Sequence, residues 1–194
     1  MAQVVFLRGV NVGRTRRLGA KEFADKLGLV NIGAAGTFVS TADESAAELE
    51  KRIRAALPFE TDVMVRPGDE ILALAASPIG RRTPAEGIER FVTVLAATPS
   101  KRPRLPINQP AEKWLVSAVQ VDGRLATCLR RIEAHGKGFY PNELIEKAYG
   151  VAATTRGWPT IAAICRVLDA AAPSLKAKSK AKAKPAKAAR RSRA

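Results

Sequence analysis

Short apolar segments of strand length alternate with segments of helical spacing along most of this chain. Residues 4–7 and 62–66 have the composition of buried strands, and glycine or proline follows each of them closely. Between them, residues 43–57 place Leu49 and Ile53 on one helical stripe. An alternation of this kind predicts helices packed on a sheet, and it excludes an all-helical fold.

The second half of the chain carries the strongest hairpin signal. Asp122-Gly123 separates apolar runs at residues 115–121 and 124–129, and Asp-Gly is favoured in two-residue hairpin turns. We therefore predict an α+β protein with a mixed, largely antiparallel sheet and helices packed on it. Further strands are expected at residues 29–32, 37–40, 89–95 and 151–155, and further helices at residues 69–76, 142–149 and 159–171, with a short helix that stops at Gly28.

Composition divides the chain into four segments. They are a first α/β half (residues 1–98), a connection with four prolines (99–110), a second α/β half (111–173) and a tail rich in lysine and alanine (174–194). About 175 residues remain without the tail, which is enough for a hydrophobic core that needs neither disulfides nor metal.

The tail differs from the rest of the chain in charge. Nine of the 33 basic residues lie in it and no acid does, which leaves 24 basic against 18 acidic residues, a formal charge of +6, elsewhere. The nine are Lys176, Lys178, Lys180, Lys182, Lys184, Lys187, Arg190, Arg191 and Arg193. From Lys176 onward the tail has no large apolar side chain to offset the roughly 1–2 kcal/mol per residue that backbone ordering costs, so we predict it to be disordered when free.

This charge asymmetry predicts binding to nucleic acid or another polyanion. No aromatic residue is interleaved with the lysines, so binding should not depend on base sequence. The alternative interpretation is a solubilising tail without a dedicated target.

A glycine-rich turn after the first strand suggests a second kind of site. Gly9 and Gly13 are followed by Arg14-Thr15, but a Walker phosphate loop needs four residues between its glycines and then a lysine. The spacing therefore favours a tight turn with solvated arginines. Backbone N–H groups and arginine still suit phosphate, so the alternative hypothesis is an enzyme or sensor for a small phosphorylated or anionic ligand, bound near Gly13 by Arg8, Asn11, Arg14 and Arg156.

Other catalytic and metal signals are weak. His135 is the only histidine and has the neighbours of a surface loop residue, and Cys128 and Cys165 have no zinc-site spacing. A disulfide between these cysteines is possible, but nothing resembles a secreted framework. We predict no cofactor and no metal, and the sequence does not decide whether the chain is an enzyme. With no signal peptide and no apolar window of membrane-spanning length, we expect a cytoplasmic protein, associated with the nucleoid or the ribosome through its tail.

Two motifs resemble a known family. Phe6-Leu7-Arg8-Gly9-Val10-Asn11-Val12-Gly13 is similar to the "LRGINVGG" opening of the bacterial domain-of-unknown-function family 1697, and Thr154-Thr155-Arg156-Gly157-Trp158-Pro159-Thr160-Ile161 is similar to its "TTRNWNTV" box. The resemblance covers roughly residues 3–170. It implies an α+β fold, with two ferredoxin-like halves as one arrangement, and it implies no established activity, substrate or catalytic residue. The family's Gln-Ser-Gly-Asn turn is replaced by Ala34-Ala35-Gly36-Thr37, and its Arg-Asn-Trp by Arg156-Gly157-Trp158, and both changes remove polar side chains.

Overall fold

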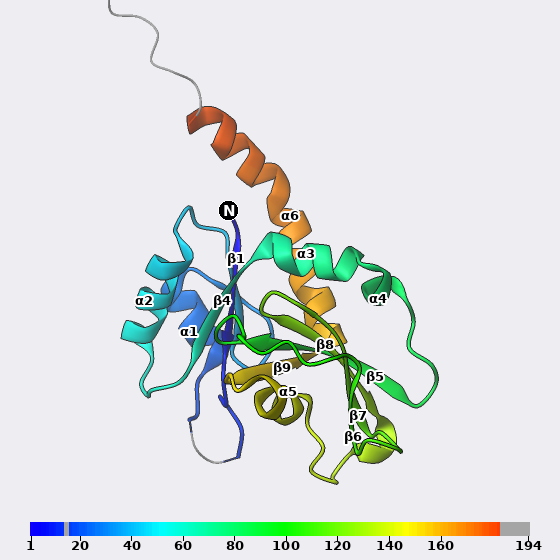
Figure 1. The fold of residues 1–194 in the computed structure, drawn as a ribbon. Coiled ribbons are helices and arrows are strands. Elements are labelled where there is room, and N and C mark those ends of the chain that lie inside the picture. Colours follow the sequence, from blue (N-terminus) through cyan, green and yellow to red (C-terminus); the bar gives the residue numbers. More distant parts are fainter. Residues whose placement is uncertain (14–15, 183–194) are drawn as a thin grey trace, which may run out of the picture.

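Two antiparallel sheets form the framework of the protein (Figure 1). This computed structural model describes residues 1–13 and 16–182, with side chains up to residue 172. The first sheet has the order β2-β3-β1-β4 and is built from β1 (Gln3–Leu7), β2 (Val30–Asn31), β3 (Thr37–Ser40) and β4 (Val63–Pro67). The second has the order β6-β7-β8-β5-β9 and is built from β5 (Ile88–Leu95), β6 (Ile107–Gln109), β7 (Val116–Asp122), β8 (Leu125–Arg131) and β9 (Ala153–Gly157).

The first sheet and its two helices have a ferredoxin-like arrangement. The helix α1 (Ala20–Leu27) connects β1 to β2, and α2 (Ala46–Ala56) connects β3 to β4, which gives the order β-α-β-β-α-β. The expected stop at Gly28 is confirmed, since this residue caps α1 in the left-handed conformation. A reciprocal pair of hydrogen bonds between Ser45 and Glu48 caps the start of α2.

The second sheet is a ferredoxin-like variant that lacks one helix. Its strands β5, β7, β8 and β9 are arranged as the four strands of the first sheet are, and α5 (Pro141–Tyr149) connects β8 to β9. A proline-rich segment and the edge strand β6 stand where the other connecting helix would be. The α+β prediction, with a largely antiparallel sheet, is confirmed.

Two boundaries differ from the sequence expectation. We placed residues 89–95 in the first half, but β5 pairs with β8 and β9 and so belongs to the second sheet. Residues 99–110 were expected to be only a connection, but their end forms β6 and pairs with β7. The predicted boundaries followed the proline content of the chain. Proline content does not show which strands pair with one another.

Three apolar clusters divide the protein into layers. One lies between α1, α2 and the outer face of the first sheet, and another lies between α5 and the outer face of the second sheet. The central cluster joins the inner faces of both sheets through residues such as Phe6 and Val92. The helices α3 (Gly68–Ala76) and α6 (Trp158–Lys182) close this central cluster with Ile71, Ile161 and Leu168. The two sheets therefore share one core.

The last helix is longer than expected. The sequence placed its end at Ala171, whereas α6 continues to Lys182 and extends out of the body beyond α3 (Figure 1). The backbone of residues 174–182, expected in the disordered tail, is thus helical, and lysine and alanine both have high helix propensity. Two shorter elements, α4 (Pro78–Arg81) and the 3-10 helix η1 (Ile132–Ala134), were also missed. None of the helices in the part of the chain that the structure describes is long and apolar enough to cross a membrane.

Candidate functional site

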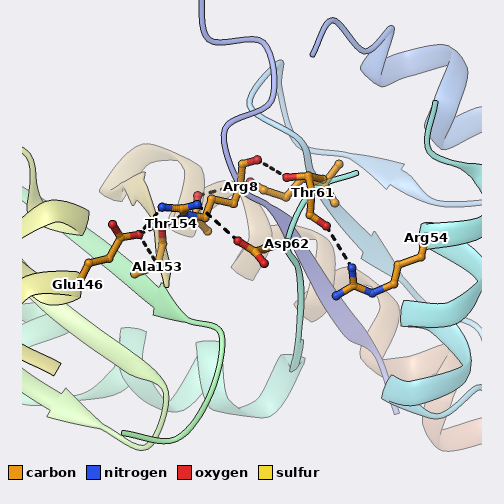
Figure 2. A network of polar contacts seen from close by, with 8 residues as sticks. Arg8, Arg54, Thr61, Asp62, Glu146, Ala153 and Thr154 are labelled. Carbon is orange, nitrogen blue, oxygen red and sulfur yellow. Dashed lines mark hydrogen bonds and ion pairs between the residues drawn. The ribbon is translucent and has the colours of Figure 1, made fainter. Parts of the chain in front are cut away.

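Arg8 lies at the end of β1 and connects the two sheets (Figure 2). Its Nε and Nη2 atoms donate to Oε1 of Glu146 on α5, at 3.1 and 2.9 Å, and Nε also donates to the carbonyl oxygen of Ala153. Its Nη1 lies 3.5 Å from Oδ2 of Asp62, and its own carbonyl oxygen accepts from the Thr61 hydroxyl. Arg8 is half-exposed, so it remains accessible to solvent although it has several partners.

Arg156, in contrast, is buried and fully hydrogen-bonded. All five of its N–H donors have partners within the protein. The acceptors are the hydroxyls of Thr37 and Thr154 and the carbonyl oxygens of Leu7, Ala35, Gly36 and Thr155, at 2.6 to 3.3 Å. None of these partners is a carboxylate. Burial lowers the pKa of Arg156 to about 10, which still leaves it charged at neutral pH.

The two motifs that carry the family resemblance meet at this point. Arg156 of the closing motif donates to Leu7 of the opening motif, and Thr154 donates to the same carbonyl oxygen. The turn that ends at Gly36 completes the junction, since the carbonyl oxygens of Ala35 and Gly36 accept hydrogen bonds from Arg156. Gly36 has a φ of +67°, and a Cβ atom there would lie 2.9 Å from Cβ of Leu7. A side chain at this position would therefore displace the turn from Arg156.

The other two residues of the predicted anion site have different places. The side-chain amide of Asn11 donates to the carbonyl oxygens of Leu18 and Ala34, and its oxygen accepts from the N–H of Leu18. Asn11 thus closes the loop after β1. Arg14 lies outside the described residues. The hypothesis of one anion held by all four residues stays a prediction, and Arg156 has no donor left for such a ligand.

A hollow of about 680 Å³ lies beside Arg8. Arg16 and Arg54 also line it, together with residues 57–62, which include Glu60 and Asp62. Arg54 is held by Glu50 and by the carbonyl oxygen of Thr61. Arg16 is exposed and has no side-chain hydrogen bond or ion pair within the described residues. Of the three arginines that line the hollow, Arg16 is therefore the one whose guanidinium is available to bind an anion.

The comparisons with known proteins give a family and a fold. Residues 1–122 match the family described as "Protein of unknown function (DUF1697)". The chain belongs to the DUF1697 family. Its structure is similar to that of the conserved bacterial protein SP0830 from Streptococcus pneumoniae, with a TM-score of 0.59 and 17% sequence identity over 86% of this chain and 98% of that one. At this identity the similarity shows the fold alone. No curated protein matches the chain.

Several polar residues of this DUF1697 protein escaped sequence analysis. Glu146 reads as a solvated residue near the start of a helix, yet it pairs with Arg8 and accepts from the N–H of Ala153. Arg66 lies in an apolar strand run and gives no signal, yet it is 4% exposed. Neither role could be found without the sheet pairing, because the partners are far apart in sequence or are backbone groups.

The remaining titratable residues have ordinary structural roles. His135 lies in the expected loop, half-exposed, with its Nε2 at 2.7 Å from Oε2 of Glu89. Burial raises the pKa of Cys128 to about 12, so this thiol stays protonated at neutral pH and is a poor nucleophile. Cys165 is also a free thiol. No group of metal-ligating side chains is found in the part of the chain that the structure covers.

Of the nine basic tail residues, Lys184, Lys187, Arg190, Arg191 and Arg193 lie outside the described residues. Lys176, Lys178, Lys180 and Lys182 lie on the helical backbone of α6. The tail thus begins on a helix, away from the arginine hollow, since α6 and the loop after β1 lie at opposite ends of the protein (Figure 1).

Proposed function

We propose that this DUF1697 protein binds nucleic acid independently of sequence through the basic segment that begins on α6. The observation that carries the proposal is that α6 extends beyond the core and carries the first four of the nine cations in a sequence that has no acid from Lys176 onward. Among the residues of α6 whose side chains the structure describes, Leu168 is the last that belongs to the central core, and Lys176 follows it by about two helical turns. A run of lysines attracts phosphate by its charge, and phosphate contacts do not depend on the base sequence. We place this activity in the cytoplasm, at the nucleoid or the ribosome.

The proposal is tested by charge removal in the full chain. One variant replaces Lys176, Lys178, Lys180 and Lys182 with glutamine, and a matched control replaces the exposed body lysines Lys21, Lys26, Lys51 and Lys147 with glutamine. Both lose four positive charges, but only the first loses them from the segment. Binding to a labelled 20-base-pair duplex is followed by fluorescence anisotropy over a series of salt concentrations.

The expected result concerns how the binding constant depends on salt concentration. If the protein neutralises roughly six phosphates of the duplex, log K falls with a slope of about −5 against log salt. The segment variant should bind at least about tenfold more weakly with a clearly shallower slope, while the body variant keeps the slope of the unmodified protein. Equal losses in the two variants would show that net charge alone, and not the segment, attracts the duplex.

The arginine hollow supports a second candidate function, binding of a small phosphorylated or anionic ligand. The observation that favours it is the unpartnered Arg16 beside Arg8. Arg16→Gln should remove any thermal stabilisation by millimolar phosphate or ATP, and Arg17→Gln, an exposed arginine outside the hollow, should retain it. Identical stabilisation of both variants would exclude the hollow as the site.

A further inference from the structure

A second cavity, of about 570 Å³, lies away from the arginine hollow and between other elements. The end of β4 and the helix α3 form one wall, with Arg66, Glu70 and Ser77. Thr98, after β5, and the β7–β8 turn form the other wall, with Asp122 and Arg124 part of that turn. The cavity thus opens where the two sheets adjoin, a common location for ligand sites, and its volume is in the range of small-molecule pockets.

Arg66 is a buried cation whose terminal donors are not used by the protein. Its side chain is 4% exposed, and its Nε donates to the carbonyl oxygen of Val65. Its Nη1 forms a long ion pair with Oε2 of the half-exposed Glu70, at 3.8 Å, which is too far for a hydrogen bond. Its four terminal N–H groups therefore have no hydrogen bond within the described residues.

A guanidinium at this burial needs acceptors for its terminal donors. Burial of a charge is costly unless hydrogen bonds compensate it, and Arg156 shows how this protein compensates a buried guanidinium elsewhere. The terminal N–H groups of arginine form a planar fork that matches a carboxylate or a phosphate with two parallel hydrogen bonds. An oxyanion in the cavity would supply the hydrogen-bond acceptors that Arg66 lacks among the described residues.

The other lining residues narrow the choice of oxyanion. The lining contains two arginines, Arg66 and Arg124, and two acids, Glu70 and Asp122, so its formal charges balance. A phosphate dianion would add negative charge beside two carboxylates, which disfavours it. A molecule with one carboxylate and one ammonium group adds no net charge. Its carboxylate can pair with an arginine and its ammonium group with an acid. Ala73, Leu74 and Leu125 add an apolar part to the lining.

We propose that this cavity binds a small α-amino acid or a similar zwitterion, with its carboxylate on Arg66, its ammonium group facing Glu70, and its side chain against Leu74 and Leu125. This site is independent of the nucleic-acid segment and of the arginine hollow. Leucine serves as the probe because it carries all three features.

The test titrates the full chain, labelled with ¹⁵N-arginine, with four separate probes and follows the side-chain signals by NMR. The probes are leucine, 4-methylpentanoate, which lacks the ammonium group, leucinamide, which lacks the carboxylate, and inorganic phosphate. We expect leucine to shift the Arg66 signals saturably, with 4-methylpentanoate about tenfold weaker, because one charge-assisted contact is lost. Leucinamide and phosphate should leave Arg66 unchanged, and the Arg156 signals should move with none of the four.

Variants of Arg66 and Glu70 separate the contribution of the ligand's carboxylate from that of its ammonium group. Arg66→Gln should abolish leucine binding, while Arg81→Gln, an exposed arginine outside the cavity, should leave it unchanged. Glu70→Gln should weaken leucine about tenfold without affecting 4-methylpentanoate. If none of the probes moves the Arg66 signals, if phosphate moves them more than leucine does, or if Arg66→Gln binds leucine normally, the proposal is wrong.

Discussion

Arg156 and Arg66 are the same residue type at nearly the same burial, 6% and 4% exposed, in two regions of one protein. Arg156 has hydrogen-bond acceptors for all of its donors and holds the junction between β9 and the opening loop. Arg66 has one hydrogen bond, to the carbonyl oxygen before it, and lines a cavity. The comparison teaches that burial alone does not assign a role to an arginine. The number of unused donors distinguishes a structural guanidinium from one available to a ligand.

The largest expected effect is on Arg156. Arg156→Met should lower the free energy of unfolding by about 3–5 kcal/mol, because the carbonyl oxygen of Ala35 loses its donor and those of Leu7 and Gly36 each lose one of their donors. Urea denaturation measures the change. Arg156→Lys should lose somewhat less, because an ammonium group offers three donors where the guanidinium offers five. A loss below about 1 kcal/mol for Arg156→Met would mean that Arg156 does not have the structural role assigned to it in this comparison.

The turn that receives Arg156 gives the next effect. Gly36→Ala should cost about 3 kcal/mol, from the positive φ and from the contact of the new Cβ with Leu7. Gly33→Ala is the matched control, because Gly33 has a similar φ of +77° but open space around its Cβ position. It should cost only about 1–2 kcal/mol. Equal costs in thermal or urea unfolding would mean that the close approach to Leu7 is unimportant.

A smaller effect is expected at the half-exposed pair of Arg8 and Glu146. A double-mutant cycle with Arg8→Gln and Glu146→Gln should give a coupling of about 0.5–1 kcal/mol, since water screens the pair. The coupling should decrease in 1 M salt. A coupling above about 3 kcal/mol would place this pair with the buried interactions, and would make Arg8 rather than Arg156 the main link between the sheets.

The smallest change in stability is expected at Arg66. Arg66→Met should leave the free energy of unfolding within about 1 kcal/mol of the unmodified protein, or raise it, because the substitution removes a poorly compensated buried charge. Glu70 is 45% exposed and stays solvated without its neighbour. If urea denaturation shows a loss as large as that for Arg156→Met, Arg66 is a structural residue and the contrast between the two arginines fails.

Local signals in the sequence predicted much of the fold. Gly28 and Gly150 stop their helices in the left-handed conformation, and Asp122-Gly123 turns the hairpin between β7 and β8. These features depend on a few neighbouring residues, which is why the sequence shows them. The division into two sheets depends on pairing between distant strands, such as β5 with β9, and local composition does not report it.

The candidate site was less predictable. Arg8 and Arg156 were singled out from their motifs, and the structure brings those motifs together. The sequence could not show that Arg156 is saturated by backbone carbonyl groups, because every residue has such a group. It also could not show that the terminal N–H groups of Arg66 have no hydrogen bond within the described residues, since an unused donor is a property of the surrounding fold and not of any residue pattern.

The position of α6 in chain order has a consequence for synthesis on the ribosome. This helix closes the central core for both sheets, yet it follows every strand that the structure describes. Chains emerge at about 5–20 residues per second, so for some seconds the inner faces of both sheets, with Phe6 and Val92, lack their final cover. The nascent protein therefore passes through an interval in which it is a natural client for chaperones, and that interval ends only when the last helix leaves the exit tunnel.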